Sequence, residues 1–218
     1  MDVSLVILNY NLSQFVSRAI RSCLAQIIFR KSIEIIVVDD NSSDDSLKII
    51  NEFKNDVKVI ANKKNQGIGY SSNIALQKSK GKFWMRVDAD DFLNQHACQS
   101  MLSLLEENNN FDYVYCDHFR VDVDGVKIDK VKLNSRLNLL KHGAGVMFRT
   151  EVLRSIGGYN KEMRNCEDYD LLARLHLKRK KGFYLPVPLY RYYIHGKNIT
   201  LEKDRKKIEN KIRKKYGF

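Results

Sequence analysis

Three carboxylates follow directly after an apolar run in the segment GKFWMRVDADD, which spans Gly81–Asp91. Asp88, Asp90 and Asp91 would repel one another at short range and raise one another's pKa. A divalent cation between them removes that cost, and Mg²⁺ or Mn²⁺ holds carboxylates while leaving positions open for phosphate oxygens. The segment therefore predicts a metal–diphosphate site at the end of a strand. An acidic loop or a helix N-terminus is the plain alternative, and it stays open on these residues alone.

A second acidic pair, Glu167 and Asp168, opens a predicted helix in the second half of the chain. A carboxylate near an acceptor hydroxyl can take its proton while the oxygen attacks a sugar carbon, so Asp168 is a candidate general base. Glu167 could instead complement the helix dipole. His195 is a candidate nitrogen ligand for the metal or a contact for the diphosphate. A structural role stays open for each of these residues.

Two further polar clusters could contact a nucleotide. Asp39 and Asp40 follow an apolar run, and a carboxylate there can accept the N3–H of uracil or a ribose hydroxyl, although turn residues have the same composition. The segment Asn65–Gly69 begins like a dinucleotide fingerprint, but Ser72 stands where the third glycine would be. It predicts a tight loop that lets the backbone approach a nucleotide.

Alternating strand and helix patterns surround these residues in the first half of the chain. They imply a parallel sheet with right-handed crossovers, and ligands bind beyond the carboxyl ends of such strands. Asn9–Asn11, Asp39–Asp40 and Asp88–Asp91 all fall at that edge. The predicted strands are Val3–Leu8, Ile33–Val38, Val57–Ala61 and Phe83–Val87. Three helices are predicted between them: one that begins near Ser13, one that contains Leu47–Phe53 and one at Ile68–Ser79.

The second half of the sequence has a mixed pattern. A turn at Asp124–Gly125 is expected to join two strands as a hairpin. Other predicted elements are a helix around Leu102–Leu105, strands at Tyr113–Val121, Val126–Ile128 and Ala144–Arg149, a helix at Glu167–Lys178, an extended aromatic segment at Tyr184–Ile194 and a basic helix at the C-terminus.

Composition bounds the class of protein. A chain of 218 residues with 44% hydrophobic residues is long enough for one large α/β domain. The four cysteines are scattered, which favours reduced thiols over disulfides or a zinc site. The N-terminal apolar run lacks the basic residues of a signal peptide, and no run has the length of a membrane span. We therefore expect a cytoplasmic protein.

The net charge of +12 is unevenly distributed. Residues 201–218 contain eight basic and three acidic residues, a net charge of +5. Ile208, Ile212 and Tyr216 recur every four residues there, so the tail predicts a helix with a thin apolar stripe. A solvated helix, an anionic membrane surface and nucleic acid are the three alternatives. The acidic sheet edge disfavours nucleic acid, whereas a weak peripheral contact at the cytosolic face of a membrane fits the tail.

Taken in order, the motifs resemble family 2 glycosyltransferases with the GT-A fold, which are inverting enzymes that use nucleotide sugars. The resemblance covers residues 3 to about 200. It implies an α/β fold with a Rossmann-like, mostly parallel central sheet flanked by helices, and a smaller mixed subregion on the acceptor side. The motifs that carry it are Val3–Asn11, Ile36–Asp44, Asn65–Gly67, Asn73, Asp88–Asp91, Ile156–Tyr159, Glu167–Leu171, Tyr190–His195 and Asn198.

The resemblance also implies roles for individual residues. Asp168 would be the catalytic base, with Glu167 near the acceptor. The divalent metal, Mn²⁺ or Mg²⁺, would be held by Asp90 with Asp88 or Asp91, and His195 would approach it. Residues 1–92 would form the nucleotide-sugar half, residues 93–200 the acceptor and catalytic half, and residues 201–218 the basic helix. The nucleotide-sugar contacts would be Asn9, Asn11, Asp39, Asp40, Asn65, Gly67, Asn73, Asp88, Ala89 and Asp90.

The expected function is transfer of a hexosyl or N-acetylhexosaminyl group from a UDP-linked donor to a sugar or lipid-linked acceptor. Cell-surface polysaccharide, lipopolysaccharide or glycolipid synthesis would be the setting. The family often has arginine before Asn73, where this chain has Ser72, so Lys63 or Lys64 is expected to supply the cationic diphosphate contact. A sugar-1-phosphate nucleotidyltransferase and a non-catalytic nucleic-acid-binding domain are the alternatives. The sequence leaves the oligomeric state open.

Overall fold

A computed structural model describes residues 1–141, 143–196, 198 and 204–217 of the chain. Its described strands form one mixed sheet in the order β3-β2-β1-β4-β8-β6-β9-β5, with β7 paired to β6. The strands are β1 (Val3–Asn9), β2 (Ile33–Asp39), β3 (Lys58–Ala61), β4 (Phe83–Asp88), β5 (Phe92–Leu93), β6 (Tyr113–Val121), β7 (Lys127–Val131), β8 (Val146–Arg149) and β9 (Gly182–Tyr193). The helices are α1 (Ser13–Leu24), α2 (Ser46–Asn51), α3 (Ile68–Lys78), α4 (Ala97–Glu107), α5 (Arg136–Lys141), α6 (Thr150–Ser155), α7 (Glu167–Leu177) and α8 (Arg205–Tyr216).

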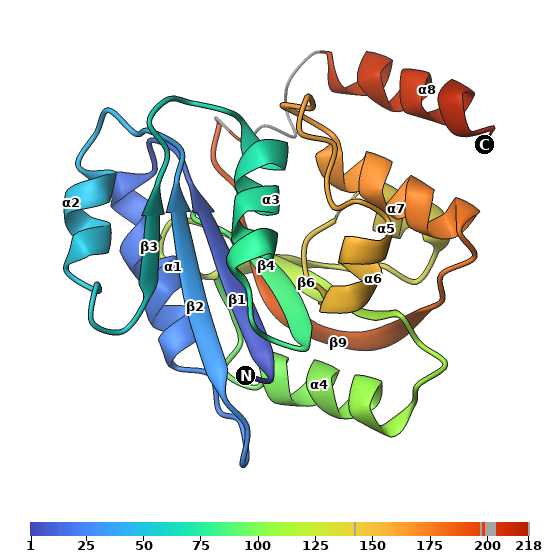
Figure 1. Cartoon of the computed structure of the whole chain (residues 1–218), viewed down its shortest axis with the longest axis horizontal. Coiled ribbons are helices and arrows are strands. Elements are labelled where there is room, and N and C mark those ends of the chain that lie inside the picture. The colour runs from blue at the N-terminus through green and yellow to red at the C-terminus, as the bar shows by residue number, and fades with distance from the viewer. Residues whose placement is uncertain (142, 197, 199–203, 218) are drawn as a thin grey trace.

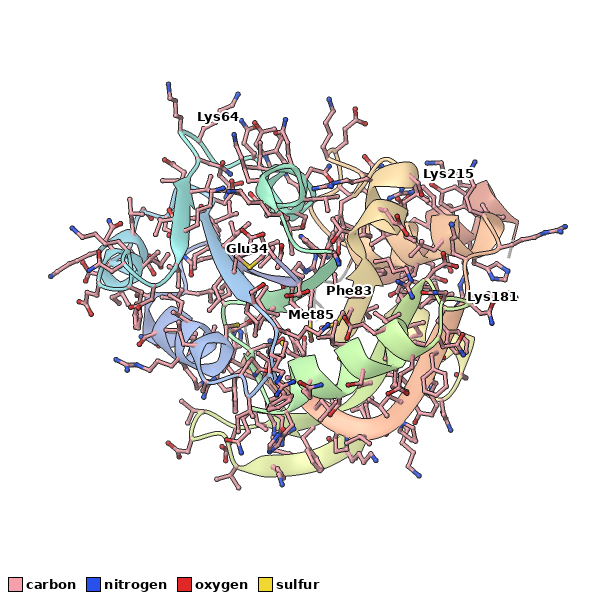
Figure 2. The ribbon with its side chains drawn as sticks, turned by 60° about the horizontal axis from the view of Figure 1, so that its bottom comes forward. Glu34, Lys64, Phe83, Met85, Lys181 and Lys215 are labelled. Atoms are coloured by element: carbon pink, nitrogen blue, oxygen red, sulfur yellow. The ribbon has the colours of Figure 1, made fainter. Side chains whose placement is uncertain are left out.

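Helices cover both faces of this sheet, and β1 shows why. All seven of its residues are buried, because side chains at alternate positions enter opposite cores. Leu5 and Ile7 pack with α1, α2 and α4, whereas Val6 and Leu8 pack with α3, α6 and α7. In Figure 1, α1 lies behind the sheet and α3 in front of it. Phe83 and Met85 of β4 point into the core shared with α4 (Figure 2).

Register aligns the polar ends of the central strands. β1 pairs in parallel with β2, so that Asn9 lies opposite Asp39, and in parallel with β4, so that Leu8 lies opposite Asp88. The predicted parallel sheet and the gathering of these polar residues at its carboxyl edge are both confirmed.

The second half extends the sheet in mixed orientation. β8 runs antiparallel to β4 and β6, and the predicted hairpin is confirmed by the antiparallel pairing of β6 and β7. β9 runs parallel to β6 and then pairs with β5, where Leu93 lies opposite Tyr190. This path carries the end of β9 to the residues that follow β4. The short elements β5, α5 and α6 were not predicted from the sequence.

The basic C-terminal helix is present as α8, but its apolar stripe faces inward. Ile212 is buried, and Ile208 and Tyr216 pack against the core that α7 completes. α8 lies beside α7 in Figure 1. The stripe is therefore occupied by the protein itself, which corrects the expectation that it contacts a membrane. Residues 201–203 and Phe218 of the predicted tail lie outside the described residues.

In the part of the chain that the structure describes, none of the helices combines the length and apolar character needed to cross a bilayer.

Candidate active site

A cleft of about 1310 Å³ opens where β1, β2 and β4 end and α7 begins. Asp90 and Asp168, which are far apart in the sequence, both line it. The predicted site residues that line this cleft are Asn9, Asn11, Asp40, Asn65, Gly67, Asp88, Ala89, Asp90, Glu167, Asp168 and His195.

Asp90 and His195 meet at the floor of the cleft. His195 Nε2 lies 2.9 Å from Asp90 Oδ2. The imidazole ring stacks on Tyr193 with 5.1 Å between ring centroids, and on Phe15 with 5.8 Å. Asn198 accepts a 2.7 Å hydrogen bond from the backbone N–H of His195. The ring is therefore fixed in place beside the carboxylate.

Asp91 is a correction to the predicted metal ligands. Its side chain is buried, because Tyr190 Oη donates to Oδ2 at 2.8 Å and the backbone N–H of Tyr193 donates to Oδ1 at 2.8 Å. Burial raises the pKa of Asp91 well above its ordinary value, and repulsion by Asp90 and Asp88 adds to the effect. Asp91 thus holds the end of β9 against the Asp88–Asp91 segment. It is not among the described residues that line the cleft, whereas Asp88 and Asp90 are.

Without Asp91, the predicted metal ligands are Asp88, Asp90 and His195, and their side chains suit Mn²⁺ or Mg²⁺. Asp88 Oδ1 is buried and receives no hydrogen bond within the described residues, although Arg86 Nε lies 3.2 Å away. Two carboxylates and one imidazole are a suitable donor set for Mn²⁺, with diphosphate oxygens and water completing the shell. No three His, Cys, Asp or Glu side chains among the described residues form a complete ligand set by themselves. Asp90, Asp88 and His195 would therefore hold the metal jointly with the substrate.

Arg86 joins the two acidic clusters. Its Nη1 donates a 2.8 Å hydrogen bond to Glu167 Oε1, and its side chain is only 10% exposed. Burial opposes its charge, but Asp88 and Glu167 raise the pKa of the Arg86 guanidinium well above its ordinary value. Burial raises the pKa of Glu167 to about 7, against the lowering effect of Arg86. Burial also raises the pKa of Asp88, although Arg86 lowers it.

Asp168 stands at the start of α7, where the helix dipole favours negative charge. Its Oδ2 accepts a 3.0 Å hydrogen bond from the backbone N–H of Gly143, and its Oδ1 accepts one of 2.7 Å from Tyr169 N. A Cβ on Gly143 would lie 2.4 Å from Asp168 Cβ, so this close approach requires glycine. Cys166, just before α7, has a left-handed backbone with φ 59°, which turns the chain into the helix.

The two carboxylates after β2 have different surroundings. Asp40 lines the cleft, where it accepts hydrogen bonds from the backbone N–H groups of Gln66 and Gly67 and thereby fixes that loop. Asp39 accepts bonds from Asn9 and Ser42 beneath the cleft. Asp39 therefore braces strand ends, a correction to its prediction as a nucleotide contact.

Asn9 has one side-chain atom without a partner. Its Nδ2 donates to Asp39, but its buried Oδ1 receives no hydrogen bond within the described residues. Asn11 is also held in place, because its Oδ1 accepts a 2.8 Å hydrogen bond from the backbone N–H of Ser43. Both residues line the cleft.

Arg164 lines the cleft beside Asn65 and Gly67. Its Nη1 lies 3.2 Å from Asn65 Oδ1, and both residues line the cleft. Lys63 and Lys64 are not among its described lining residues, and Figure 2 shows Lys64 at the outer rim of the molecule. The expected lysine contact to a diphosphate therefore gains no support from the cleft, whereas Arg164 is placed to face a bound ligand.

Asn73 is a further correction. Its side chain hydrogen-bonds both the backbone N–H and the carbonyl of Tyr159, at 2.8 Å and 2.7 Å. It borders a separate, shallow hollow of about 550 Å³ beside Arg154. Asn73 therefore joins α3 to the loop after α6 and lies outside the predicted nucleotide site.

Sequence reasoning missed several residues that build the site. Arg86 is the one basic residue of β4, a strand that is otherwise apolar up to Asp88, and this signal could have marked it as a partner for buried carboxylates. Arg18 carried no such signal. It donates to the carbonyls of Asp90 and Val123 and lies 4.6 Å from the centroid of the Phe92 ring.

The family model for glycosyl transferase family 2 matches residues 4–166. The chain belongs to this family. It is 29% identical over 214 residues to chondroitin synthase of Escherichia coli, covering 92% of this chain and 30% of that protein. It is 28% identical over 212 residues to hyaluronan synthase of Pasteurella multocida, covering 92% of this chain and 21% of that protein. The chain therefore spans less than a third of the length of these two relatives.

Solved structures show the same GT-A fold. Staphylococcus aureus TarS 1–349 in complex with UDP-GlcNAc has a TM-score of 0.77 at 23% identity, covering 93% of this chain and 61% of that one. The mannosyltransferase PcManGT from Pyrobaculum calidifontis, in complex with GDP-Man and Mn²⁺, has a TM-score of 0.73 at 16% identity, covering 90% of this chain and 58% of that one. The predicted fold class and family are confirmed.

Proposed function

We propose that this member of family 2 transfers a sugar from a nucleotide sugar to an acceptor hydroxyl, with inversion at the anomeric carbon. One observation carries the proposal: the acidic group after β4 and the acidic pair that opens α7 line the same cleft. The first group suits a metal–diphosphate and the second suits a general base. Such a cleft can hold a donor and an acceptor side by side.

Asp168 would act as the base. The acceptor O–H gives its proton to the Asp168 carboxylate as its oxygen bonds to the anomeric carbon from the side opposite the leaving group. The bond from that carbon to the diphosphate oxygen breaks, and its electron pair leaves with the nucleoside diphosphate. The hydrogen bond from Gly143 N would hold this carboxylate in position. Inversion follows because a single displacement occurs without a covalent enzyme intermediate.

Asp90, Asp88 and His195 would hold Mn²⁺ or Mg²⁺, which would supply positive charge to stabilise the leaving diphosphate. Arg86 keeps Asp88 and Glu167 in fixed positions through its two ion pairs. Glu167 would lie near the acceptor. Arg164 would contact the donor phosphates from the nucleotide end of the cleft, where it is already held by Asn65.

A UDP-linked donor is the first choice. TarS, a structural neighbour, was solved with UDP-GlcNAc, and the curated relative TarS of Staphylococcus aureus is named a poly(ribitol-phosphate) beta-N-acetylglucosaminyltransferase. Together with the chondroitin and hyaluronan synthases, it supports a hexosyl or N-acetylhexosaminyl group and a place in polysaccharide, lipopolysaccharide or glycolipid synthesis. The acceptor would be a sugar or a lipid-linked sugar at the cytosolic face of a membrane.

A screen of nucleotide sugars tests the proposed function. UDP-, GDP- and dTDP-sugars are added with Mn²⁺, Mg²⁺ or EDTA, and both hydrolysis and the melting temperature are measured. A ligand that binds only the folded state at 100 times its Kd stabilises that state by about 2.7 kcal/mol. We expect metal-dependent stabilisation by one UDP-sugar. Equal melting temperatures for all donors, with and without metal, would contradict the proposal.

A further inference from the structure

The C-terminal helix is docked on the helix that carries the catalytic pair. Arg213 Nε donates a 2.8 Å hydrogen bond to Tyr169 Oη, and Tyr216 Oη donates one of 2.7 Å to Asp170 Oδ1. Ile212 is buried between the two helices. Tyr169 and Asp170 directly follow the catalytic pair in the first turns of α7. The position of α8 is thereby tied to the start of α7.

This docking brings the first residue of α8 to the cleft. Arg205 lines the cleft together with Asp168, and its side chain is only 13% exposed. Its carbonyl oxygen lies 4.0 Å from Cys166 Sγ, just before α7. Its Nε donates a 2.9 Å hydrogen bond to Glu209, one turn further along α8, which restricts the guanidinium to this place. Sequence patterns place Arg205 in a basic tail, whereas the fold places it in the site.

We propose that α8 is part of the catalytic apparatus, and that Arg205 is a positioning residue whose charge stabilises the ionised, proton-accepting form of Asp168. The inference rests on the proposed function, because it assumes that Asp168 acts as the base. It adds a residue of the C-terminal helix to the site.

The charges around Asp168 support this role. Arg86 is already engaged by Asp88 and Glu167, so it does not serve Asp168 alone. Burial opposes the charge of Arg205, but Asp168 and Glu209 raise its pKa above the ordinary value. Within the described residues, the titratable and charged groups that interact with Asp168 are Arg86 and Asp88 from β4, Tyr159 from the loop after α6, Cys166 and Glu167 beside it, and Arg205 from α8, which is paired with Glu209.

Removing Arg205 would leave an excess of negative charge around Asp168. A nearby cation favours the ionised form of a carboxylate, so loss of the Arg205 charge should favour the protonated form. A base that is protonated at the working pH accepts no proton from the acceptor. The predicted defect is therefore a change in the pH profile of turnover, whereas nucleotide binding persists.

The test compares Arg205→Gln, Arg205→Lys and Lys207→Gln with the wild-type chain. The pH profile of kcat is measured with the nucleotide sugar found in the screen, and UDP binding in the presence of Mn²⁺ is measured by calorimetry. For Arg205→Gln we expect the acidic limb of the profile to move up by about 1 pH unit, with a UDP affinity within about twofold of wild type. Arg205→Lys should restore most of the profile. Lys207 is exposed on the same helix and controls for loss of one charge.

Two results would overturn the inference separately from the proposed function. One is a wild-type profile in Arg205→Gln, and the other is a uniform loss of kcat at every pH that lysine does not rescue. If Arg205→Gln fails to fold, Tyr216→Phe weakens the docking of α8 and should move the acidic limb in the same direction by a smaller amount; no movement would overturn the inference. A wild-type chain that turns over no nucleotide sugar overturns the proposed function and this inference together.

Discussion

Arg86 Nη1 donates a 2.8 Å hydrogen bond to Glu167 Oε1, so the strand that ends in the proposed metal-binding segment is fastened to the helix that carries the proposed base. Both side chains are nearly buried, with 10% and 6% of their surfaces exposed. The same guanidinium lies 3.2 Å from Asp88. One buried cation therefore fixes the spacing between the two halves of the site.

Arg86→Met should destabilise the fold strongly at neutral pH. Removing one partner of a buried ion pair costs about 3–5 kcal/mol, because the other charge is left without compensation. Urea unfolding at pH 8 measures the loss. The matched control is Arg120→Met, since Arg120 pairs with Asp129 on the surface and such pairs contribute about 0–1 kcal/mol. An equal loss of unfolding free energy in the two variants would show that the buried Arg86 ion pairs stabilise the fold no more than a surface pair does.

Glu167→Gln should change how stability depends on pH. The pKa of Glu167 is raised to about 7 in the folded state, so the folded chain holds a proton there that the unfolded chain releases near its ordinary value. The wild-type free energy of unfolding should therefore fall as the pH rises from about 4.5 to about 7. The variant should lose this part of the slope, as measured by urea unfolding across that range. The exposed Glu162→Gln serves as control, and an unchanged slope in Glu167→Gln would contradict the assignment.

Ile212→Ala should loosen α8 and expose Cys166. Truncating a buried isoleucine to alanine costs about 2–5 kcal/mol, which here weakens the docking of α8 on α7. Cys166 is buried beside Arg205, so it should react with a thiol reagent faster in the variant than in the wild type. Peptide mapping identifies the labelled cysteine. Lys211→Ala changes an exposed residue of the same helix and should leave the rate unchanged. Slow labelling of Cys166 in Ile212→Ala would contradict the docking.

Contact of α8 with an anionic membrane should depend on charge alone. Its apolar stripe is packed against α7, whereas Lys206, Lys211, Lys214 and Lys215 are exposed, and Figure 2 shows Lys215 and Lys181 at one side of the molecule. Each lysine near an anionic surface contributes about 1 kcal/mol. The chain should float with phosphatidylserine vesicles at low salt, and changing these four lysines to glutamine should abolish the effect. Equal recovery with neutral phosphatidylcholine vesicles would contradict a contact that depends on charge.

The sequence was sufficient to predict which polar residues gather at the carboxyl edge of the sheet, because each of them follows a clear strand pattern. The buried apolar runs before Asn9, Asp39 and Asp88 have the length of strands, and parallel pairing brings their ends together. The hairpin at Asp124–Gly125 was predicted for the same reason, since turn residues stand between two strand patterns.

The remaining features depend on contacts between residues distant in the chain. The sequence motif makes Asp91 look like a metal ligand. Only the path of β9 shows that Tyr190 and Tyr193 donate hydrogen bonds to both of its carboxylate oxygens. The stripe on α8 has the same sequence pattern whether it faces lipid or α7, so Ile212 could be assigned only from the fold. The position of Arg205 in the cleft could likewise be assigned only from the fold.

The most direct test separates the two acidic groups of the cleft in Asp168→Asn and Asp90→Asn. Calorimetry of UDP with and without Mn²⁺ and the rate of sugar transfer are measured for each variant. We predict that Asp168→Asn binds UDP and Mn²⁺ like the wild type and loses about 10²–10⁴-fold in transfer, the usual contribution of a general base. Asp90→Asn should lose the metal-dependent part of UDP binding. Near-normal turnover in Asp168→Asn, or metal-dependent binding that survives in Asp90→Asn, would contradict the assignment of a metal–diphosphate site and a base to one cleft.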